Sequence, residues 1–264
     1  MHKIIVTSDW HCGAATGLTN MGKDYGKNEL IPYQDRREEL WFHFTTRLLN
    51  YCVDADELWV VGDVINGPFR GEAKRDNLNN VIDQQCAMAV DIFDWICKHT
   101  HIGKFLIVEG TEWHVGDGSA ERGIAARIGA QATKGKIIDR GGVLIDVKHG
   151  VGGSNRPHLH GNALLAEYEA AVSNANRHGT KIPDIIMRAH RHVFDKREGI
   201  CIRNGQKTAW VGMILPSLQA WGSDYAKKVH ASTYPDIGFA VIDVKGDRGF
   251  DISTYIFNMR SQLS

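Results

Sequence analysis

Five groups of carboxylate and imidazole side chains lie directly after short apolar stretches of the chain. The groups are Asp9-Trp10-His11, Gly62-Asp63, Gly110-Thr111-Glu112-Trp113-His114, His149-Gly150 and His190-Arg191-His192. In an extended segment, side chains two residues apart point to the same side, so Asp9 and His11 can reach one ligand. Carboxylates and imidazoles without thiolates suit divalent Mn, Fe or Zn ions better than a structural zinc site. The five groups therefore predict a metal centre.

This prediction depends on the set of groups and not on any one residue. A single histidine, in a chain that has 13 of them, is more often structural than metal-binding. Several polar groups at the ends of apolar strands would be costly to bury without partners, and metal ions would supply these partners. Two ions roughly 3.5–4 Å apart could share one bridging carboxylate, polarise a phosphoryl oxygen and lower the pKa of a bound water. This chemistry indicates hydrolysis of a phosphate ester.

The first half of the chain predicts a parallel sheet that would position these groups. Apolar stretches at 3–8, 57–61 and 104–108 read as buried strands, and apolar residues at helical spacing separate them. The two helical stripes consist of Leu40, Phe44, Leu48 and Tyr51, and of Ile82, Cys86, Ala89, Phe93 and Ile96. Strands that alternate with helices form a parallel layer, and ligands gather at the carboxyl ends of its strands.

The second half of the chain predicts antiparallel strands around one further helix. Segments 137–147 and 200–211 read as hairpins, the second with Asn204-Gly205 at its turn. A helical stripe lies at 164–175, a strand at 183–187, and two final strands at 239–244 and 252–257. We expect one α/β domain over residues 1–264, built as a two-layer β-sandwich flanked by helices.

The composition excludes few functions but favours an ordinary globular protein. Lys plus Arg and Asp plus Glu both total 31, so no overall charge points to nucleic acid or to a membrane. No apolar stretch approaches the roughly 18 residues that span a bilayer, and the start of the chain does not resemble a signal peptide. The five cysteines form no C-x-x-C pair, which favours reduced thiols. We expect a cytoplasmic protein with no membrane partner.

In their order along the chain, the motifs resemble those of the calcineurin-like metallophosphoesterases. The family pattern is D-x-H, G-D-x-x-x-G, G-N-H-(D/E), H-G and G-H-x-H, and this chain follows it from Asp9 to His192. The resemblance implies an α/β/β/α fold and two divalent ions, with Mn as the first candidate and Fe, Zn, Ni or Mg as alternatives. It also implies hydrolysis of a phosphate mono- or diester by a hydroxide that the two ions activate. We slightly prefer a phosphodiesterase or nuclease, whose substrate would be a nucleotide or nucleic acid.

The resemblance also assigns roles to individual residues by position. The first ion would be bound by Asp9, His11, Asp63 and His192, with Asp63 as the bridge between the two ions. The second ion would be bound by His149 and His190 together with Asp63. Ala189 replaces the glycine that precedes the last motif. Asn66 and Arg156 are candidates for binding the substrate, although the loop that carries Arg156 could equally be an ordinary surface loop.

The third motif departs from the family pattern. The family has an Asn ligand and then a catalytic His, whereas this chain has Thr111, Glu112, Trp113 and His114. The Glu112 carboxylate or the Thr111 hydroxyl could replace the missing amide, and His114 could serve as general acid or phosphate contact. The spacing resembles that of phage- and prophage-encoded members. The alternative function is a metal-stabilised scaffold or interaction protein with the same fold and little catalytic activity.

Overall fold

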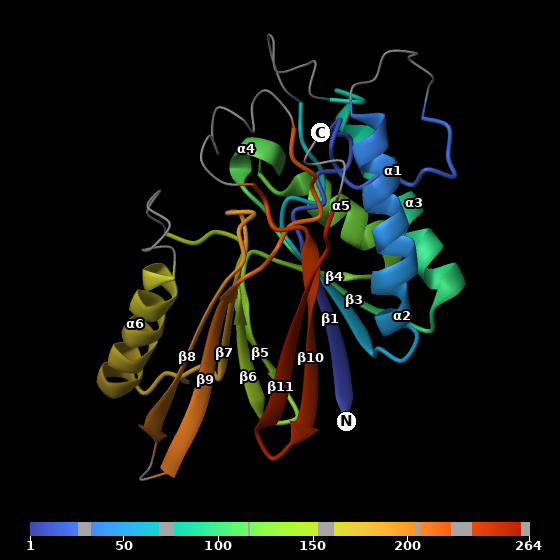
Figure 1. The fold of residues 1–264 in the computed structure, drawn as a ribbon. Helices are drawn as coiled ribbons and strands as arrows, with labels where there is room; N and C mark the ends of the chain where they lie inside the picture. Colours follow the sequence, from blue (N-terminus) through green and yellow to red (C-terminus); the bar gives the residue numbers. More distant parts are fainter. Residues whose placement is uncertain are drawn as a thin grey trace.

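Two β-sheets form the centre of the computed structural model (Figure 1), which describes residues 1–25, 33–68, 77–115, 117–152, 161–203, 206–222 and 234–259. The first sheet has six strands in the order β11-β10-β1-β2-β3-β4, and the second has five in the order β5-β6-β7-β9-β8. The predicted α/β class with two sheet layers flanked by helices is confirmed.

The six-stranded sheet contains the predicted parallel layer. Its strands are β1 (His2–Ser8), β2 (Glu57–Val61), β3 (Lys104–Val108), β4 (Gln131–Thr133), β10 (Gly238–Gly246) and β11 (Gly249–Ile256). The strands β1 to β4 run parallel to one another, whereas β10 and β11 are antiparallel to their neighbours. The predicted strands 57–61 and 104–108 have the same bounds as β2 and β3.

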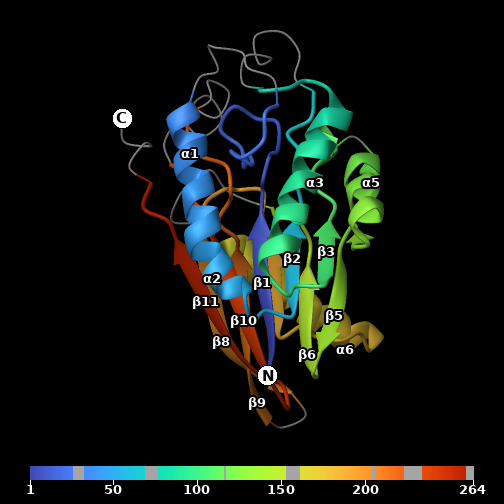
Figure 2. The same ribbon diagram turned by 90° about the vertical axis from the view of Figure 1, so that its right-hand side faces the viewer.

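Helices connect the parallel strands and cover the outer face of this sheet (Figure 2). The helical segments in this half of the chain are α1 (Gln34–His43), the π-helical η1 (Phe44–Leu48), α2 (Leu49–Cys52), α3 (Ile82–His99), the short α4 (Glu112–Val115) and α5 (Ser119–Ile128). The predicted stripe residues Leu40, Phe44 and Leu48 are buried, and Tyr51 packs against the same core. None of the described helices is both long enough and apolar enough to cross a membrane.

The five-stranded sheet is mixed and carries a single long helix among the described residues. Its strands are β5 (Lys136–Arg140), β6 (Val143–Val147), β7 (Ile185–Arg188), β8 (Asp195–Arg203) and β9 (Gln206–Ile214), and α6 (Asn162–His178) lies on its outer face. The predicted hairpins appear as the antiparallel pairs β5–β6 and β8–β9. The predicted turn Asn204-Gly205 lies outside the described residues.

One apolar core lies between the two sheets, and a larger one lies between the six-stranded sheet and the helices that cover it. Ile4 and Val6 of β1 join Ile145 of β6 and Met187 of β7 in the core between the sheets, whereas Ile5 packs on the opposite side, under the helices. This alternation follows from the period of two along a strand. Because both faces of the sheet are covered, its strands are continuous apolar runs, and the polar residues come only where the strands end.

Candidate metal centre

The five polar groups that the sequence singled out meet at one edge of the sheets. The loops after β1 and β2 are joined by their backbones, because the Asp9 N–H donates to the Gly62 carbonyl (3.1 Å) and the His11 N–H to the Asp63 carbonyl (2.9 Å). The loop after β7 joins them where the His190 N–H donates to Asp9 Oδ2 (3.3 Å). Loops far apart in the chain therefore form one connected structure.

The loops after β3 and β6 reach the same centre because each has a residue in contact with the Asp63 carboxylate. The Thr111 N–H and its hydroxyl donate to Asp63 Oδ1 at 2.7 and 3.1 Å. His149 Nε2 lies 3.0 Å from Asp63 Oδ2. Asp63 is thus the carboxylate that Thr111 and His149 both contact.

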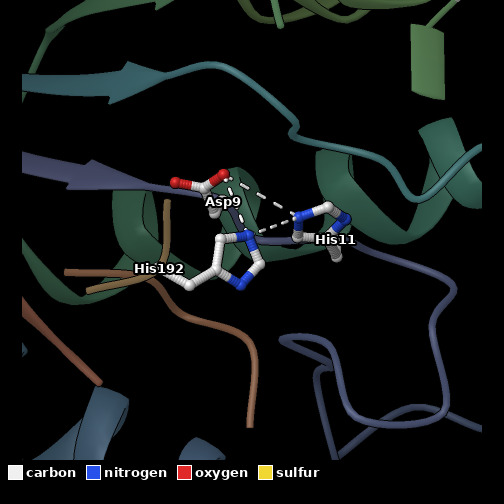
Figure 3. A group of neighbouring side chains, drawn as sticks. All are labelled: Asp9, His11 and His192. Carbon is white, nitrogen blue, oxygen red and sulfur yellow. Dashed lines mark hydrogen bonds and ion pairs between the residues drawn. The ribbon is translucent and has the colours of Figure 1, made fainter. Parts of the chain in front are cut away.

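Three overlapping clusters of side chains could each hold a cation. They are Asp9–His11–His192, His11–Asp63–His114 and Asp63–His149–His190, and within each cluster the ligand atoms lie within 4.8 Å of one another. In the first cluster, His192 Nε2 lies 3.2 Å from Asp9 Oδ1 and 3.3 Å from His11 Nε2 (Figure 3). All six residues that the sequence assigned to two metal ions are therefore brought together, with His114 beside them.

Hydrogen bonds orient three of the imidazole rings toward the carboxylates. The Nδ1 atoms of His149 and His114 donate to backbone carbonyls, those of Val61 (2.8 Å) and Asn66 (2.7 Å). The Nδ1 atom of His11 lies 2.9 Å from the side-chain oxygen of Asn66, which can only accept. Each of these rings then directs Nε2 toward the cluster, and a donated Nδ1–H is the arrangement that fixes metal-binding histidines.

The residues present fit a divalent cation. Asp9 and Asp63 are completely buried, yet Asp9 Oδ1 has no hydrogen-bond partner among the described residues. That oxygen instead faces the Nε2 atoms of three histidines, His192 at 3.2 Å and His11 and His149 at 3.9 Å. A buried oxygen surrounded by ring nitrogens lacks a positive partner, and a cation between them would supply it.

The pKa shifts show the same need for positive charge. Burial opposes ionisation of Asp63, but the neighbouring His149 holds the pKa of this carboxyl well below its ordinary value. Burial likewise opposes a charge on His149, yet Asp63 and Asp9 raise the pKa of its ring to about 10. Without an ion, a proton on His149 provides the positive charge. His114 behaves differently, since burial and the nearby His11 lower its pKa to about 4.

Five of the proposed ligands have a left-handed backbone. The φ angles are 50° at Asp9, 46° at His11, 48° at Asp63, 71° at His190 and 54° at His192. Asp and His adopt this region more readily than most residues, and the conformation lets each chain turn sharply as its strand ends. Backbone strain of this kind is concentrated at functional sites.

Two glycines allow the loops to approach the carboxylate and imidazole groups. A Cβ atom at Gly110 would lie 2.1 Å from Asp63 Oδ1, and one at Gly62 would lie 2.1 Å from His149 Nδ1. Neither contact is physically possible. Gly62 of the second motif and Gly110 of the third are therefore needed because a side chain at either position would overlap a neighbouring residue of the site.

The other residues that the sequence predicted for the site differ in how they lie relative to the three clusters. Glu112 is exposed at the start of α4 and belongs to none of the three clusters found among the described residues. Thr111 directs its hydroxyl to Asp63, while the buried side chain of Asn66 bonds to His11 and to Asn77. Arg156 lies outside the described residues.

One buried carboxylate near the centre was missed by sequence reasoning. Glu121 in the first turn of α5 is completely buried, and its carboxylate accepts the N–H groups of Val64 and Gly110. Burial raises the pKa of Glu121 to about 8, against the effect of these amides. An acidic residue in the first turn of a helix is common and gives no signal of such a role.

No family model matches the chain, and no curated protein sequence matches it. A solved structure described as a novel archaeal phosphodiesterase aligns with 96% of this chain and 99% of its own, at 8% identity and a TM-score of 0.45. A metallophosphoesterase from Sphaerobacter thermophilus aligns with 98% of this chain and 89% of its own, at 12% identity and a TM-score of 0.41. Purple acid phosphatase PPD1 from seeds of yellow lupin (Lupinus luteus) aligns with 97% of this chain and 52% of its own, at 12% identity and a TM-score of 0.47.

The activities in these descriptions belong to those proteins, and at such identities and scores they assign no activity to this chain. What this chain itself contains is an α/β fold with two sheets, at whose edge buried carboxylates and imidazoles converge on a position that suits divalent cations.

Proposed function

We propose that the protein is a metal-dependent phosphoesterase that hydrolyses a phosphate mono- or diester. The observation that carries this proposal is the convergence of the buried carboxylates of Asp9 and Asp63 with the inward-facing Nε2 atoms of His11, His149 and His192. Such a site without thiolates suits reversible binding of hard or borderline divalent ions. The slight preference for diesters, and hence for a phosphodiesterase or nuclease, stays a prediction from the sequence.

We assign the ligands to two ions as the sequence predicted. Asp9, His11 and His192 would hold the first ion, His149 and His190 the second, and Asp63 would bridge the two. Mn²⁺ is the first candidate, since imidazole and carboxylate ligands accept several first-row ions. When bound, the ions would neutralise charge on the phosphoryl oxygens and acidify water for attack on phosphorus.

The substrate would approach from the side of the site where His190 lies. The side chain of His190 is 44% exposed, whereas those of Asp9, Asp63 and His149 are buried to within 2%. His192 and His114 are also more accessible than the two carboxylates. During hydrolysis, a water oxygen bonds to phosphorus, the ester P–O bond breaks, and the departing oxygen takes a proton.

His114 is suited to accepting a proton and not to donating one. Its Nδ1–H is committed to the Asn66 carbonyl, and its lowered pKa of about 4 leaves Nε2 unprotonated at neutral pH. Nε2 lies 3.9 Å from Asp63 Oδ2, within the His11–Asp63–His114 cluster. We therefore assign to His114 the role of hydrogen-bond acceptor for the attacking water, in place of the general acid or phosphate contact expected from the sequence.

Hydrolysis of bis-p-nitrophenyl phosphate and p-nitrophenyl phosphate with added Mn²⁺ tests the function. We expect turnover by the parent protein, no measurable turnover by Asp63→Asn, and a loss of about 100-fold or more in kcat for His114→Gln. His178→Gln, an exposed position in α6, serves as control and should keep full activity. The faster of the two substrates shows whether the enzyme prefers diesters.

Metal content distinguishes the enzyme from the scaffold alternative. If the parent protein binds Mn²⁺ but hydrolyses neither substrate, the metal site is structural and the proposal of an enzyme is wrong. If His114→Gln loses metal together with activity, His114 is a ligand and not the acceptor for water.

A further inference from the structure

A single carboxylate connects two loops of the candidate metal centre and belongs to none of the three clusters of possible ligands. Glu121 Oε1 accepts the N–H of Val64 (3.0 Å), and Glu121 Oε2 accepts the N–H of Gly110 (2.5 Å). Val64 follows Asp63 directly, and Gly110 precedes Thr111. Among the described residues, these amides are the partners found within hydrogen-bond distance of the Glu121 carboxylate.

The contacts of Glu121 complete a closed ring of interactions around Asp63. Thr111 donates its N–H and its hydroxyl to Asp63 Oδ1, and Glu121 holds the amide that precedes Thr111 and the amide that follows Asp63. The loops also touch directly, since the position of a Cβ at Gly110 would overlap Asp63. The orientation of the Asp63 carboxylate thus depends on how closely the two loops are held together.

Packing alone does not explain an acidic residue at this position. The helix α5 packs into the core through the apolar side chains of Ile124 and Ala125. A carboxylate that is completely buried loses its hydration, so an apolar side chain of similar size would be less costly if the position were only structural.

We propose that Glu121 is a positioning residue, which fixes Asp63 and the loop after β3 in the geometry that binds the ions. This inference rests on the proposed function. Gln has one acceptor oxygen, and its NH₂ group would face an N–H donor, so Glu121→Gln releases one of the two loops. Loss of a group that orients a metal ligand typically lowers metal affinity by about 10–100-fold, and we expect a decrease in this range.

The chain offers a matched control at the opposite end of β2. Glu57 is 4% exposed, and its carboxylate pairs with Arg140 of β5 and with the Trp59 indole, remote from the five ligand loops. Glu57→Gln likewise replaces a buried carboxyl group by an amide. It should lower the thermal midpoint of the metal-free protein and leave metal affinity unchanged.

The experiment measures Mn²⁺ affinity by the electron paramagnetic resonance signal of free Mn²⁺, together with the thermal midpoints of the metal-free proteins. We expect weaker binding by Glu121→Gln, intermediate binding by Glu121→Asp, which keeps a shorter carboxylate, and parental binding by Glu57→Gln. Glu121→Asp also provides a second readout if Glu121→Gln does not fold.

Two outcomes would overturn the inference, and a third would overturn the proposed function on which it rests. Parental affinity in both Glu121 variants would show that the ring of contacts does not orient Asp63. Equal losses in Glu57→Gln and Glu121→Gln would show a general effect of destabilisation. A parent protein that binds no Mn²⁺ would overturn the metal site itself, which is a failure of the proposed function and not of the connection between the loops.

Discussion

At the scale of single residues, the proposed ligands are oriented by neighbouring side chains that are not themselves proposed as ligands. Asn66 is the clearest case, because its side-chain oxygen lies 2.9 Å from His11 Nδ1 while its amide nitrogen donates to Asn77. The sequence suggested that Asn66 binds substrate. Its burial and its two hydrogen bonds instead favour a role in holding the His11 ring.

Substitution of Asn66 separates these two roles. Asn66→Leu keeps the volume but removes the acceptor, so His11 can rotate or change tautomer, and we expect Mn²⁺ affinity to fall by about 10–100-fold. Isothermal titration calorimetry of the metal-free protein with Mn²⁺ measures this affinity. Asn50→Leu, at an exposed position of α2, is the control. A higher KM with unchanged metal affinity would support substrate binding instead.

Gly110 offers a second test at this scale. In Gly110→Ala the new methyl group would overlap Asp63 Oδ1, so the two loops must separate. We expect this variant to lose Mn²⁺ binding and activity while circular dichroism still shows a folded protein. Gly123→Ala in α5 is the control, since no atom lies within 4 Å of its added Cβ. That change should raise stability by about 1 kcal/mol, as Ala favours a helix over Gly.

At the scale of helices and strands, the sequence predicted most of the framework. Strands β2 and β3 have the predicted bounds because buried parallel strands are continuous apolar runs that stop at polar residues. The start of α1 was less predictable. Asp35 and Glu38 resemble a capping box, but the helix begins at Gln34, after Tyr33 in a left-handed conformation, with no side-chain cap.

The contacts that orient the site could not be predicted from sequence. Motif spacing identified the residues of the three clusters, because each ligand directly follows a strand. It could not show that Thr111 bonds to Asp63, that Glu112 is exposed, or that Glu121 connects two loops. These contacts and exposures depend on how close the loops lie after folding. The distances between the loops follow in turn from how helices such as α5 pack against the sheet.

The two sheets are also joined at the end remote from the metal centre. Arg140 of β5 donates from Nε and Nη2 to the two carboxylate oxygens of Glu57 in β2, at 2.8 and 3.0 Å. His2 Nε2 lies 2.9 Å from the same carboxylate, and His2 Nδ1 lies 3.4 Å from Asp56. Burial opposes ionisation of Glu57, but Arg140 lowers its pKa below the ordinary 4.5.

This pair predicts how stability changes with pH. Because the folded-state pKa of Glu57 is lowered, its contribution is present above pH 4.5 and is lost as the pH falls through the folded-state pKa. Glu57→Gln should cost about 2 kcal/mol at pH 7, as expected for hydrogen bonds to a charged group. Its thermal midpoint should fall less steeply than that of the parent between pH 5 and pH 3, about the range where the carboxyl titrates. Parallel pH curves for the two proteins would contradict this.

At the scale of the whole molecule, metal binding and folding are linked. The proposed ligands follow the ends of four strands in two sheets, so an ion bound between them would favour the folded state over the unfolded chain. A concentration 100 times the dissociation constant adds about 2.7 kcal/mol for one site. We expect Mn²⁺ to raise the thermal midpoint, and a chelator to reverse the change.

Calorimetry of the parent protein and of Asp63→Asn measures this linkage. The variant loses the carboxylate shared by two clusters, so Mn²⁺ should leave its midpoint nearly unchanged. An equal rise in both proteins would mean that the ion binds elsewhere in the molecule.

The left-handed backbone at the ligand positions affects how an inactive form of this protein should be made. Alanine at position 192 would remove the imidazole but keep a Cβ in the left-handed region, whose cost is smaller for His than for most other L-residues. The resulting loss of function would then mix missing chemistry with a weakened chain. Glycine at the same position tolerates the φ of 54° without this cost. His192→Gly is therefore the cleaner way to silence the site while the rest of the protein keeps its shape.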